Sequence, residues 1–186
     1  MKVKLLSDLG SWRSIADACN TTINKEAGDK EPSSEWKRRL LLSEHSPIRI
    51  KQIQWIWEGL KYWVSVHFVR HKFGIEHWVG TQRTDRTGVD RDKKLQSDLV
   101  IHKCQANPQA IINISRKRLC NCASKETREA WQMFLNELKH IEPELYSVCV
   151  PDCIYRGWCY EFKSCGYHKT PEFQEKLKEY RKNINQ

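Results

Sequence analysis

The strongest constraint on the fold is a run in which apolar and polar residues alternate. It spans residues 48–57, where apolar side chains recur at every second position for most of the length. Successive side chains of a β-strand point to opposite faces, so this pattern is typical of a strand with one buried face. We therefore expect a long strand over residues 48–57 and a shorter apolar strand over residues 3–6.

Much of the remaining chain has the spacing of amphipathic helices, with apolar residues three or four positions apart and capping residues or prolines at several starts. Helices are predicted for residues 9–19, 33–42, 108–122, 125–141 and 171–183. Pro143 closes the fourth of these. Residues 61–70 suit either a strand or a buried helix, and the polar, arginine-rich residues 81–92 predict an exposed loop. Strands mixed with helices predict an α/β fold.

The composition is that of a chain that folds as one compact domain. Of its 186 residues, 39% are hydrophobic and eight are Trp, a mixture too rich in large apolar side chains for a disordered chain. No stretch approaches the roughly 18 apolar residues that a membrane span needs. The first residues also lack the apolar core of a signal peptide. We expect a cytoplasmic protein that makes no contact with a membrane.

The charge balance predicts an anionic partner. Lys and Arg number 32 against 23 Asp and Glu, which gives a formal net charge of +9. Such a field attracts nucleic acids or phosphorylated small molecules. The basic residues are spread along the chain and form no dense basic tract, so charge alone leaves nucleotide and nucleic acid open.

A cluster of three basic residues, Arg70, His71 and Lys72, follows an apolar run. One interpretation is a strand or helix end that enters solvent. The other is a phosphate clamp, because Arg offers a planar fork to two oxygens, Lys a compact charge, and His an adjustable donor near neutral pH.

The order of motifs resembles that of flavin-dependent thymidylate synthases. In that family a motif begins Arg-His-Arg, and here Arg70 and His71 match while Lys72 keeps the charge of the third position. The family also has a His in a helix-ending loop some 25 residues upstream, and His45 stands at the corresponding place.

The downstream part of the resemblance lies on a predicted helix. The family has an Asn-rich helix that leads to an Arg, and Asn107, Asn113 and Arg118 fit its spacing without a gap. The resemblance covers roughly residues 3–143. It implies a central sheet with flanking helices over residues 1–147. We expect the Cys-rich segment and terminal helix that follow, residues 148–186, to pack on the same domain.

The resemblance implies an enzyme that methylates carbon 5 of dUMP with FAD, NADPH and methylenetetrahydrofolate and that assembles as a homotetramer. The small size of the chain and its altered substrate motif suit a phage or mobile-element variant. The side chains implied to face the flavin are His45, Arg70, His71, Lys72, Asn107 and Asn113. Those implied to face the nucleotide are His67, Arg70, Thr81, Arg83 and Arg118. Arg118 and Thr81 are the implied catalytic candidates. For Arg118 the reason is that a guanidinium aimed at a carbonyl oxygen stabilises the enolate-like charge that develops there. Alternatively, Arg118 pairs with Glu126 or another surface acid.

The segment implied to face the substrate departs from the family pattern. In the family, the motif continues with an Asn-Glu pair, a Ser and a closing Arg. Here the Asn-Glu pair falls near residues 76–78 and the Ser near Thr81, and Arg83 matches the closing Arg only if one residue is inserted. Three further positions differ from the family, which has an acidic residue in place of Ile50, a basic residue in place of Gln109 and a Gln in place of Ser124. These departures leave open a relative that kept the fold and lost catalysis.

Four cysteines near the end of the sequence, with a nearby His, form a candidate zinc site. The candidate ligands are Cys149, Cys153, Cys159, Cys165 and His168. Zinc prefers four thiolate or imidazole ligands, although this spacing is not that of a standard knuckle, and buried free thiols or disulfides are the alternatives. With the net charge and the Trp content, such a site also suits a zinc-stabilised nucleic-acid-binding protein.

The other thiols and the tryptophans are expected to pack. Cys19 and Cys104 are predicted core thiols, and Cys120 and Cys122 are predicted packing residues. The tryptophans at positions 55, 57, 63 and 78 are expected in the core or at an oligomer interface, although they also suit stacking on a base or a flavin ring.

Overall fold

The chain folds around a four-stranded antiparallel sheet. A computed structural model describes residues 1–26 and 28–182. Within these residues the strand order is β1-β2-β4-β3, and each neighbouring pair is antiparallel. The strands are β1 (Lys2–Leu9), β2 (Gln52–Lys61), β3 (Ile75–Val79) and β4 (Leu99–Ala106). The sheet and its helices confirm the predicted α/β class.

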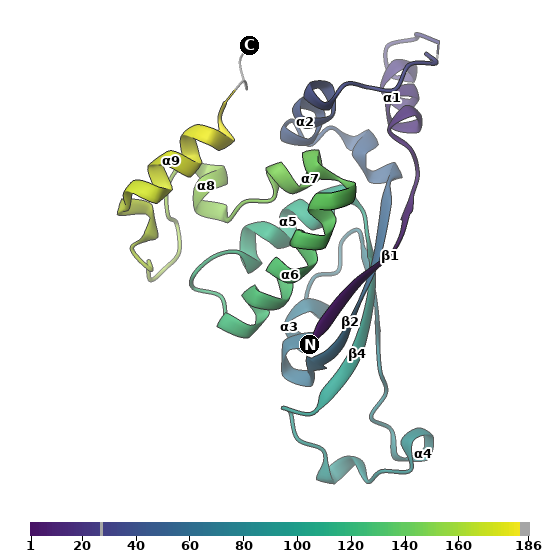
Figure 1. The fold of residues 1–186 in the computed structure, drawn as a ribbon, viewed down its shortest axis with the longest axis vertical. Coiled ribbons are helices and arrows are strands. Elements are labelled where there is room, and N and C mark those ends of the chain that lie inside the picture. Colours follow the sequence, from purple (N-terminus) through teal and green to yellow (C-terminus); the bar gives the residue numbers. More distant parts are fainter. Residues whose placement is uncertain (27, 183–186) are drawn as a thin grey trace.

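Helices α3, α5 and α6 lie on the same side of the sheet (Figure 1). The α-helices are α1 (Trp12–Thr21), α2 (Ser34–Leu42), α3 (Tyr62–Val69), α4 (Thr84–Thr87), α5 (Pro108–Arg118), α6 (Lys125–Ile141), α7 (Pro143–Val148), α8 (Asp152–Arg156) and α9 (Pro171–Tyr180). Short 3-10 helices are η1 (Ser46–Ile50), η2 (Arg91–Lys93) and η3 (Tyr167–Lys169). In the described part of the chain, no helix combines the length and hydropathy that crossing a bilayer requires.

Aromatic side chains from the sheet and the helices form the centre of the core. Trp57 of β2 stacks on Phe68 of α3 with ring centroids 4.6 Å apart. Its Nε1–H donates to the carbonyl oxygen of Ala130 in α6 over 3.1 Å. Trp131 of α6 lies against both Trp55 and Trp57. These contacts attach α3 and α6 to the sheet.

The four tryptophans expected to pack differ in their exposure. Trp55 and Trp57 are fully buried, which confirms them as core residues. Trp63 is half-buried. Trp78 is 50% exposed on the outer face of β3, so for this residue the alternative of an oligomer interface stays a prediction.

The long strand expected over residues 48–57 begins later than predicted. Its first part is the 3-10 helix η1, with Pro47 in its first turn, and β2 starts at Gln52. Proline has no N–H to donate to a strand ladder. Ile48, counted as one apolar position of the alternation, is instead fully buried in the core cluster. The prediction of a strand was wrong for residues 48–51 and is confirmed for residues 52–57.

Two strands, β3 and β4, had no counterpart among the sequence predictions. Most of the ambiguous residues 61–70 form α3, which begins where the Tyr62 N–H donates to the carbonyl oxygen of Asp98. Residues 81–92 are exposed as expected except for the half-buried Gln82, and they include the short helix α4.

All five predicted helices form, but the ends of most of them differ from the prediction. Helix α6 has the predicted bounds, whereas α5 ends at Arg118 rather than residue 122. Helix α1 begins at Trp12 because the Ser11 hydroxyl caps it by accepting from the Ser14 N–H. Pro143 starts α7 as well as following α6. Helix α9 runs to Tyr180, and residue 183 lies outside the described residues.

The last part of the chain packs on the core. The expected boundary between residues 147 and 148 falls inside α7. Ile154 of α8 and Phe173 of α9 are buried in the same hydrophobic cluster as the sheet residues. The division into two segments stays a prediction.

A buried ion network joins β1, the residue between η1 and β2, and the junction of α6 with α7. Lys51, which is 3% exposed, places its Nζ 2.8 Å from carboxylate oxygens of both Asp8 and Glu142. The same Nζ donates to the Gly10 carbonyl oxygen, and Glu142 accepts from Trp12 Nε1 over 2.9 Å. Because its charges are paired and hydrogen-bonded, the network tolerates burial.

We expect Lys51→Met to lower the free energy of unfolding by about 3 to 5 kcal/mol, because it leaves the buried Glu142 carboxylate without its cation. The double variant Lys51→Met with Glu142→Gln should recover part of this loss. Urea unfolding followed by circular dichroism gives the values. Lys4→Met, which breaks the exposed pair of Lys4 with Glu58, is the control and should cost less than about 1 kcal/mol. Equal losses for the two lysine variants would contradict a structural role for the buried network.

Candidate functional site

The candidate site lies where the end of α3 meets the end of α5. Arg118, the last residue of α5, donates from Nε to His71 Nε2 over 2.9 Å and from Nη2 to the carbonyl oxygen of His67 over 2.5 Å. The two bonds fix the plane of the guanidinium. The structure thus brings together three of the predicted site residues, and the partner of Arg118 is His71 rather than Glu126.

Burial and nearby cations favour the neutral form of the imidazoles around Arg118. Burial, followed by the charges of Arg118 and His77, lowers the pKa of His71 to about 4. Burial and the charges of Arg118 and Arg70 lower the pKa of His67. Because Arg118 donates to His71 Nε2, the ring proton of the neutral His71 is on Nδ1. The site therefore offers a cationic guanidinium beside a neutral imidazole donor.

Two tryptophan contacts explain why the helices place these groups together. Trp57 holds α3 through Phe68, as described above. Trp131 of α6 donates from Nε1 to the Ser115 hydroxyl of α5 over 2.9 Å. Ser115 is fully buried and in turn donates to the Ile111 carbonyl oxygen. The core thus fixes both helices that carry the site.

Asn107 has a local structural role. Its side chain caps α5 by accepting from the Ala110 N–H over 2.9 Å, and its N–H donates to the Gly74 carbonyl oxygen over 3.0 Å. Gly74 has φ +71, and a Cβ there would lie 2.6 Å from the Asn107 side chain. Asn107 therefore fixes the start of α5 against the turn that follows His71.

Asn113 and the segment of His45 lie on one side of α5. The side-chain Oδ1 of Asn113 accepts from Arg116, and Arg116 pairs with the carboxylate of Glu44, the residue before His45. Gln109 donates to the same carboxylate over 2.5 Å. His45 itself is exposed. Sequence reasoning missed Glu44 and Arg116, which form this link.

Arg70 and Lys72 flank His71 and are exposed. The charge of Arg70 contributes to the lowered pKa of Arg118, after the effect of burial, so the two guanidiniums lie within electrostatic reach of each other. Two like charges at one site favour an anionic ligand. This part of the predicted clamp is available to a phosphate.

Thr81 and Arg83 lie elsewhere in the chain. They belong to the connection between β3 and β4, whose helix α4 lies beyond one end of the sheet and away from α5 (Figure 1). Arg83 pairs with Asp85 over 2.7 Å and its backbone N–H donates to the Thr81 hydroxyl. Within one chain, the structure does not bring these two candidates to Arg118.

The five candidate zinc ligands of the tail line one hollow of about 840 Å³. Burial raises the pKa of the Cys149 thiol to about 12, although a hydrogen bond to Ser115 opposes the shift. His168 Nδ1 forms a hydrogen bond with the Ser164 hydroxyl over 3.1 Å. Among the described residues, the tail candidates do not form a group with all ligand atoms within 4.8 Å. Zinc in the tail stays a prediction.

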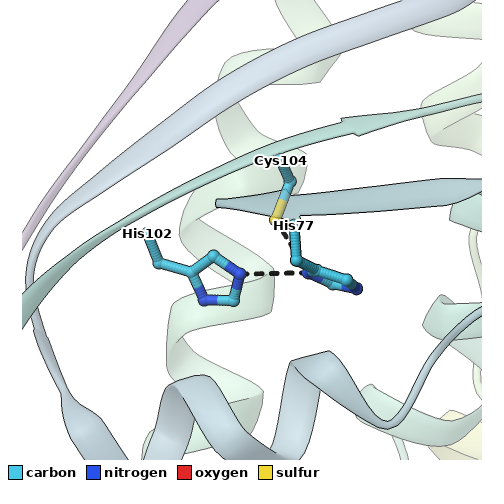
Figure 2. A group of neighbouring side chains, drawn as sticks. All are labelled: His77, His102 and Cys104. Atoms are coloured by element: carbon cyan, nitrogen blue, oxygen red, sulfur yellow. Dashed lines mark hydrogen bonds between the residues drawn. The ribbon is translucent and has the colours of Figure 1, made fainter. Parts of the chain in front are cut away.

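A compact group that the sequence did not predict lies between β3 and β4. The ligand atoms of His77, His102 and Cys104 all lie within 4.8 Å of one another, and Figure 2 shows the three side chains converging. Cys104 was expected to be a core thiol, and it is fully buried. The only sequence signal was the His-x-Cys pattern at positions 102 and 104, whose spacing places both side chains on one face of a strand.

Solved structures of nucleotide enzymes share this fold at low sequence identity. The flavin-dependent thymidylate synthase ThyX from Helicobacter pylori, complexed with FAD and dUMP, has a TM-score of 0.67 at 12% identity over 81% of this chain and 100% of that chain. A second structure of ThyX from that organism, with the same two ligands, has a TM-score of 0.66 at 13% identity over 81% and 99%.

A second kind of enzyme is also similar. The UMP/dUMP methylase PolB from Streptomyces cacaoi, bound with 5-Br dUMP, has a TM-score of 0.64 at 11% identity over 79% of this chain and 93% of that chain. No protein-family model matches the sequence, and no curated protein matches it. These likenesses confirm the fold that the motif resemblance implied.

Gly74→Ala should destabilise the chain by about 2 to 3 kcal/mol, because an L side chain at positive φ costs about 1 to 2 kcal/mol and the displaced Asn107 cap about 1 kcal/mol more. Gly88→Ala is the matched control, since Gly88 has φ +69 and nothing within 4 Å of the added Cβ. Urea unfolding of both variants measures the difference. If Gly88→Ala costs as much as Gly74→Ala, the contact with Asn107 does not fix the start of α5.

Proposed function

We propose that the chain transfers a methyl or other one-carbon group to carbon 5 of a pyrimidine deoxynucleotide such as dUMP, in an FAD-dependent reaction. The observation that carries the proposal is the guanidinium of Arg118, held between His71 and the carbonyl oxygen of His67. The shared fold supports it, because the similar structures are a thymidylate synthase complexed with FAD and dUMP and a UMP/dUMP methylase bound with 5-Br dUMP.

The side chains around Arg118 suit a flavin dinucleotide. Arg70 and Lys72 are exposed cations that can bind phosphate oxygens. His71 offers an Nδ1–H, and Asn113 offers an exposed amide on the neighbouring helix. His45 and Asn107 belong to the same proposed flavin site, where Asn107 acts by positioning α5. The bound flavin supplies hydride chemistry.

Arg118 is proposed to polarise the pyrimidine. A guanidinium directed at a base carbonyl stabilises the negative charge that develops on the oxygen as carbon 5 becomes nucleophilic. His71 keeps the guanidinium oriented, and the lowered pKa of His71 means that it does so as a neutral acceptor. His67 contributes its backbone carbonyl oxygen to Arg118, and its side chain is proposed to face the nucleotide.

The distance of Thr81 and Arg83 from Arg118 supports a site shared between copies of the chain. We propose a homotetramer in which these two residues reach the nucleotide bound at a neighbouring copy. The exposed apolar residues Trp78, Leu99 and Ile101 favour such an assembly. NADPH and methylenetetrahydrofolate are the proposed co-substrates, and the cytoplasm is the proposed location.

A nucleic-acid-binding protein is the second candidate. The exposed connection between β3 and β4 carries several basic residues, among them Arg83, Arg86 and Arg91. Together with the net charge of +9, these residues favour binding to a polyanion. The altered substrate segment also suits a relative without catalysis. Flavin and nucleotide binding separate these possibilities.

The protein should bind FAD, which a titration followed by flavin fluorescence detects. Arg70→Ala should weaken binding roughly 10- to 150-fold, because it removes a charge-assisted bond worth about 1.5 to 3 kcal/mol. Arg13→Ala, which removes an exposed arginine of α1, is the control and should leave FAD affinity unchanged. A folded wild type that leaves flavin fluorescence unaltered at high protein concentration would overturn the flavin proposal.

Arg118→Lys should weaken dUMP binding by roughly 1.5 to 3 kcal/mol, because lysine keeps the charge but not the planar donor geometry. Calorimetry with dUMP measures the loss, with Arg13→Lys as the control. In parallel, single-stranded and duplex DNA are titrated over a salt series. A steep salt dependence with DNA and no heat with dUMP would favour the nucleic-acid candidate instead, since nonspecific binding depends on the number of charges rather than on their geometry.

A further inference from the structure

Strand register brings two histidines and a cysteine together on the inner face of the sheet. His77 of β3 pairs directly with Cys104 of β4. His102 lies two positions before Cys104, so its side chain projects from the same face. Both β4 residues are fully buried, and His77 is half-buried at the edge of the group.

Two of the distances between ligand atoms in this group match those of a metal site, and the third pair of atoms lies within 4.8 Å. His77 Nδ1 lies 3.0 Å from His102 Nε2 and 3.4 Å from Cys104 Sγ. Tetrahedral zinc, with bonds of about 2.0 to 2.1 Å to nitrogen and about 2.3 Å to sulfur, places two nitrogens about 3.3 Å apart and nitrogen and sulfur about 3.6 Å apart. Each observed distance is within about 0.3 Å of these values.

The hydrogen bonds around the group orient one ligand for a metal. His77 Nε2 donates to the carbonyl oxygen of His71 over 2.9 Å, since a carbonyl can only accept. The Nδ1 lone pair of the neutral His77 therefore points toward His102 and Cys104 (Figure 2). Metal-bound histidines are held in this way by a bond from their second nitrogen to a carbonyl or carboxylate.

His102 is difficult to explain as a packing residue. It lies at 0% exposure against the rings of Trp57 and Phe68, and its Nδ1 has no hydrogen-bond partner among the described residues. A buried polar atom without a partner costs free energy that an apolar residue at this position would avoid. When Nε2 binds a metal, the proton of the neutral ring is on Nδ1, which stays without a partner in the described part of the chain, so the bond from Nε2 to the metal is what offsets that cost.

We propose that His77 Nδ1, His102 Nε2 and Cys104 Sγ bind a zinc ion. Imidazole and thiolate together suit Zn²⁺, and three protein ligands leave a fourth position to water or another donor. On binding, the Cys104 thiol releases its proton to solvent and becomes the thiolate ligand. The ion fixes β3 to β4 and, through His77, the backbone of His71. The site is separate from the predicted zinc site of the tail and does not depend on the proposed function.

Zinc retention tests the site in the full-length chain. Each protein is dialysed against micromolar zinc and then against metal-free buffer, and its zinc is measured by elemental analysis. Cys104→Ser and His77→Gln should each retain about one equivalent less than the wild type. Cys19→Ser is the matched control, because it removes a thiol of α1 that lies outside the group, and it should retain as much as the wild type. Equal retention by the wild type and both site variants would overturn the proposal.

Cadmium NMR of the wild type provides a measurement that does not require a folded variant. The ¹¹³Cd chemical shift depends on the number of bound thiolates, and the proposed site supplies one whereas the tail offers several. We expect a resonance in the range of one sulfur and two nitrogen ligands, whether or not a second resonance from the tail is present. A cadmium-loaded wild type without such a resonance would overturn the proposal.

Discussion

The candidate site depends on the packing of one side chain, Trp57. It stacks on Phe68 of α3 and donates a hydrogen bond to the Ala130 carbonyl oxygen of α6, while Trp131 extends the contact to α5 through Ser115. Stacked aromatic rings bury large apolar areas with specific geometry, so they fix positions as well as stabilise the fold. Because α3 ends near His71 and α5 ends at Arg118, this packing sets the geometry of the pair on which the proposed chemistry depends.

Local signals in the sequence predicted the helices better than the strands. Helix α6 has a capping serine and a regular apolar stripe, and both are properties of the segment itself. The start of β2 was misplaced because alternation alone does not reveal that Pro47 turns the chain into a 3-10 helix. Strands β3 and β4 were missed, since their partly exposed sequences form strands only through pairing with each other and with β2.

The candidate site shows the same contrast between local signals, which the sequence reveals, and contacts between distant segments, which it does not. Motif order placed Arg118 and His71 in one site, and the structure adds that they bind each other. The distance of Thr81 from Arg118 follows from the path of the β3–β4 connection, which no local pattern encodes. The group of His77, His102 and Cys104 joins residues up to 27 positions apart, and its existence depends on strand register. Sequence reasoning therefore identified residues by type and order but not by long-range contact.

The strand order β1-β2-β4-β3 leaves two edge strands, and both are poorly suited to aggregation. Strand β1 carries exposed Lys2 and Lys4, and its register is irregular between Leu5 and Ser7. Strand β3 is only five residues long. Edge lysines, irregular register and short length each discourage intermolecular strand addition. The proposed assembly would therefore use the side chains of the outer sheet face rather than backbone hydrogen bonds at the sheet edges.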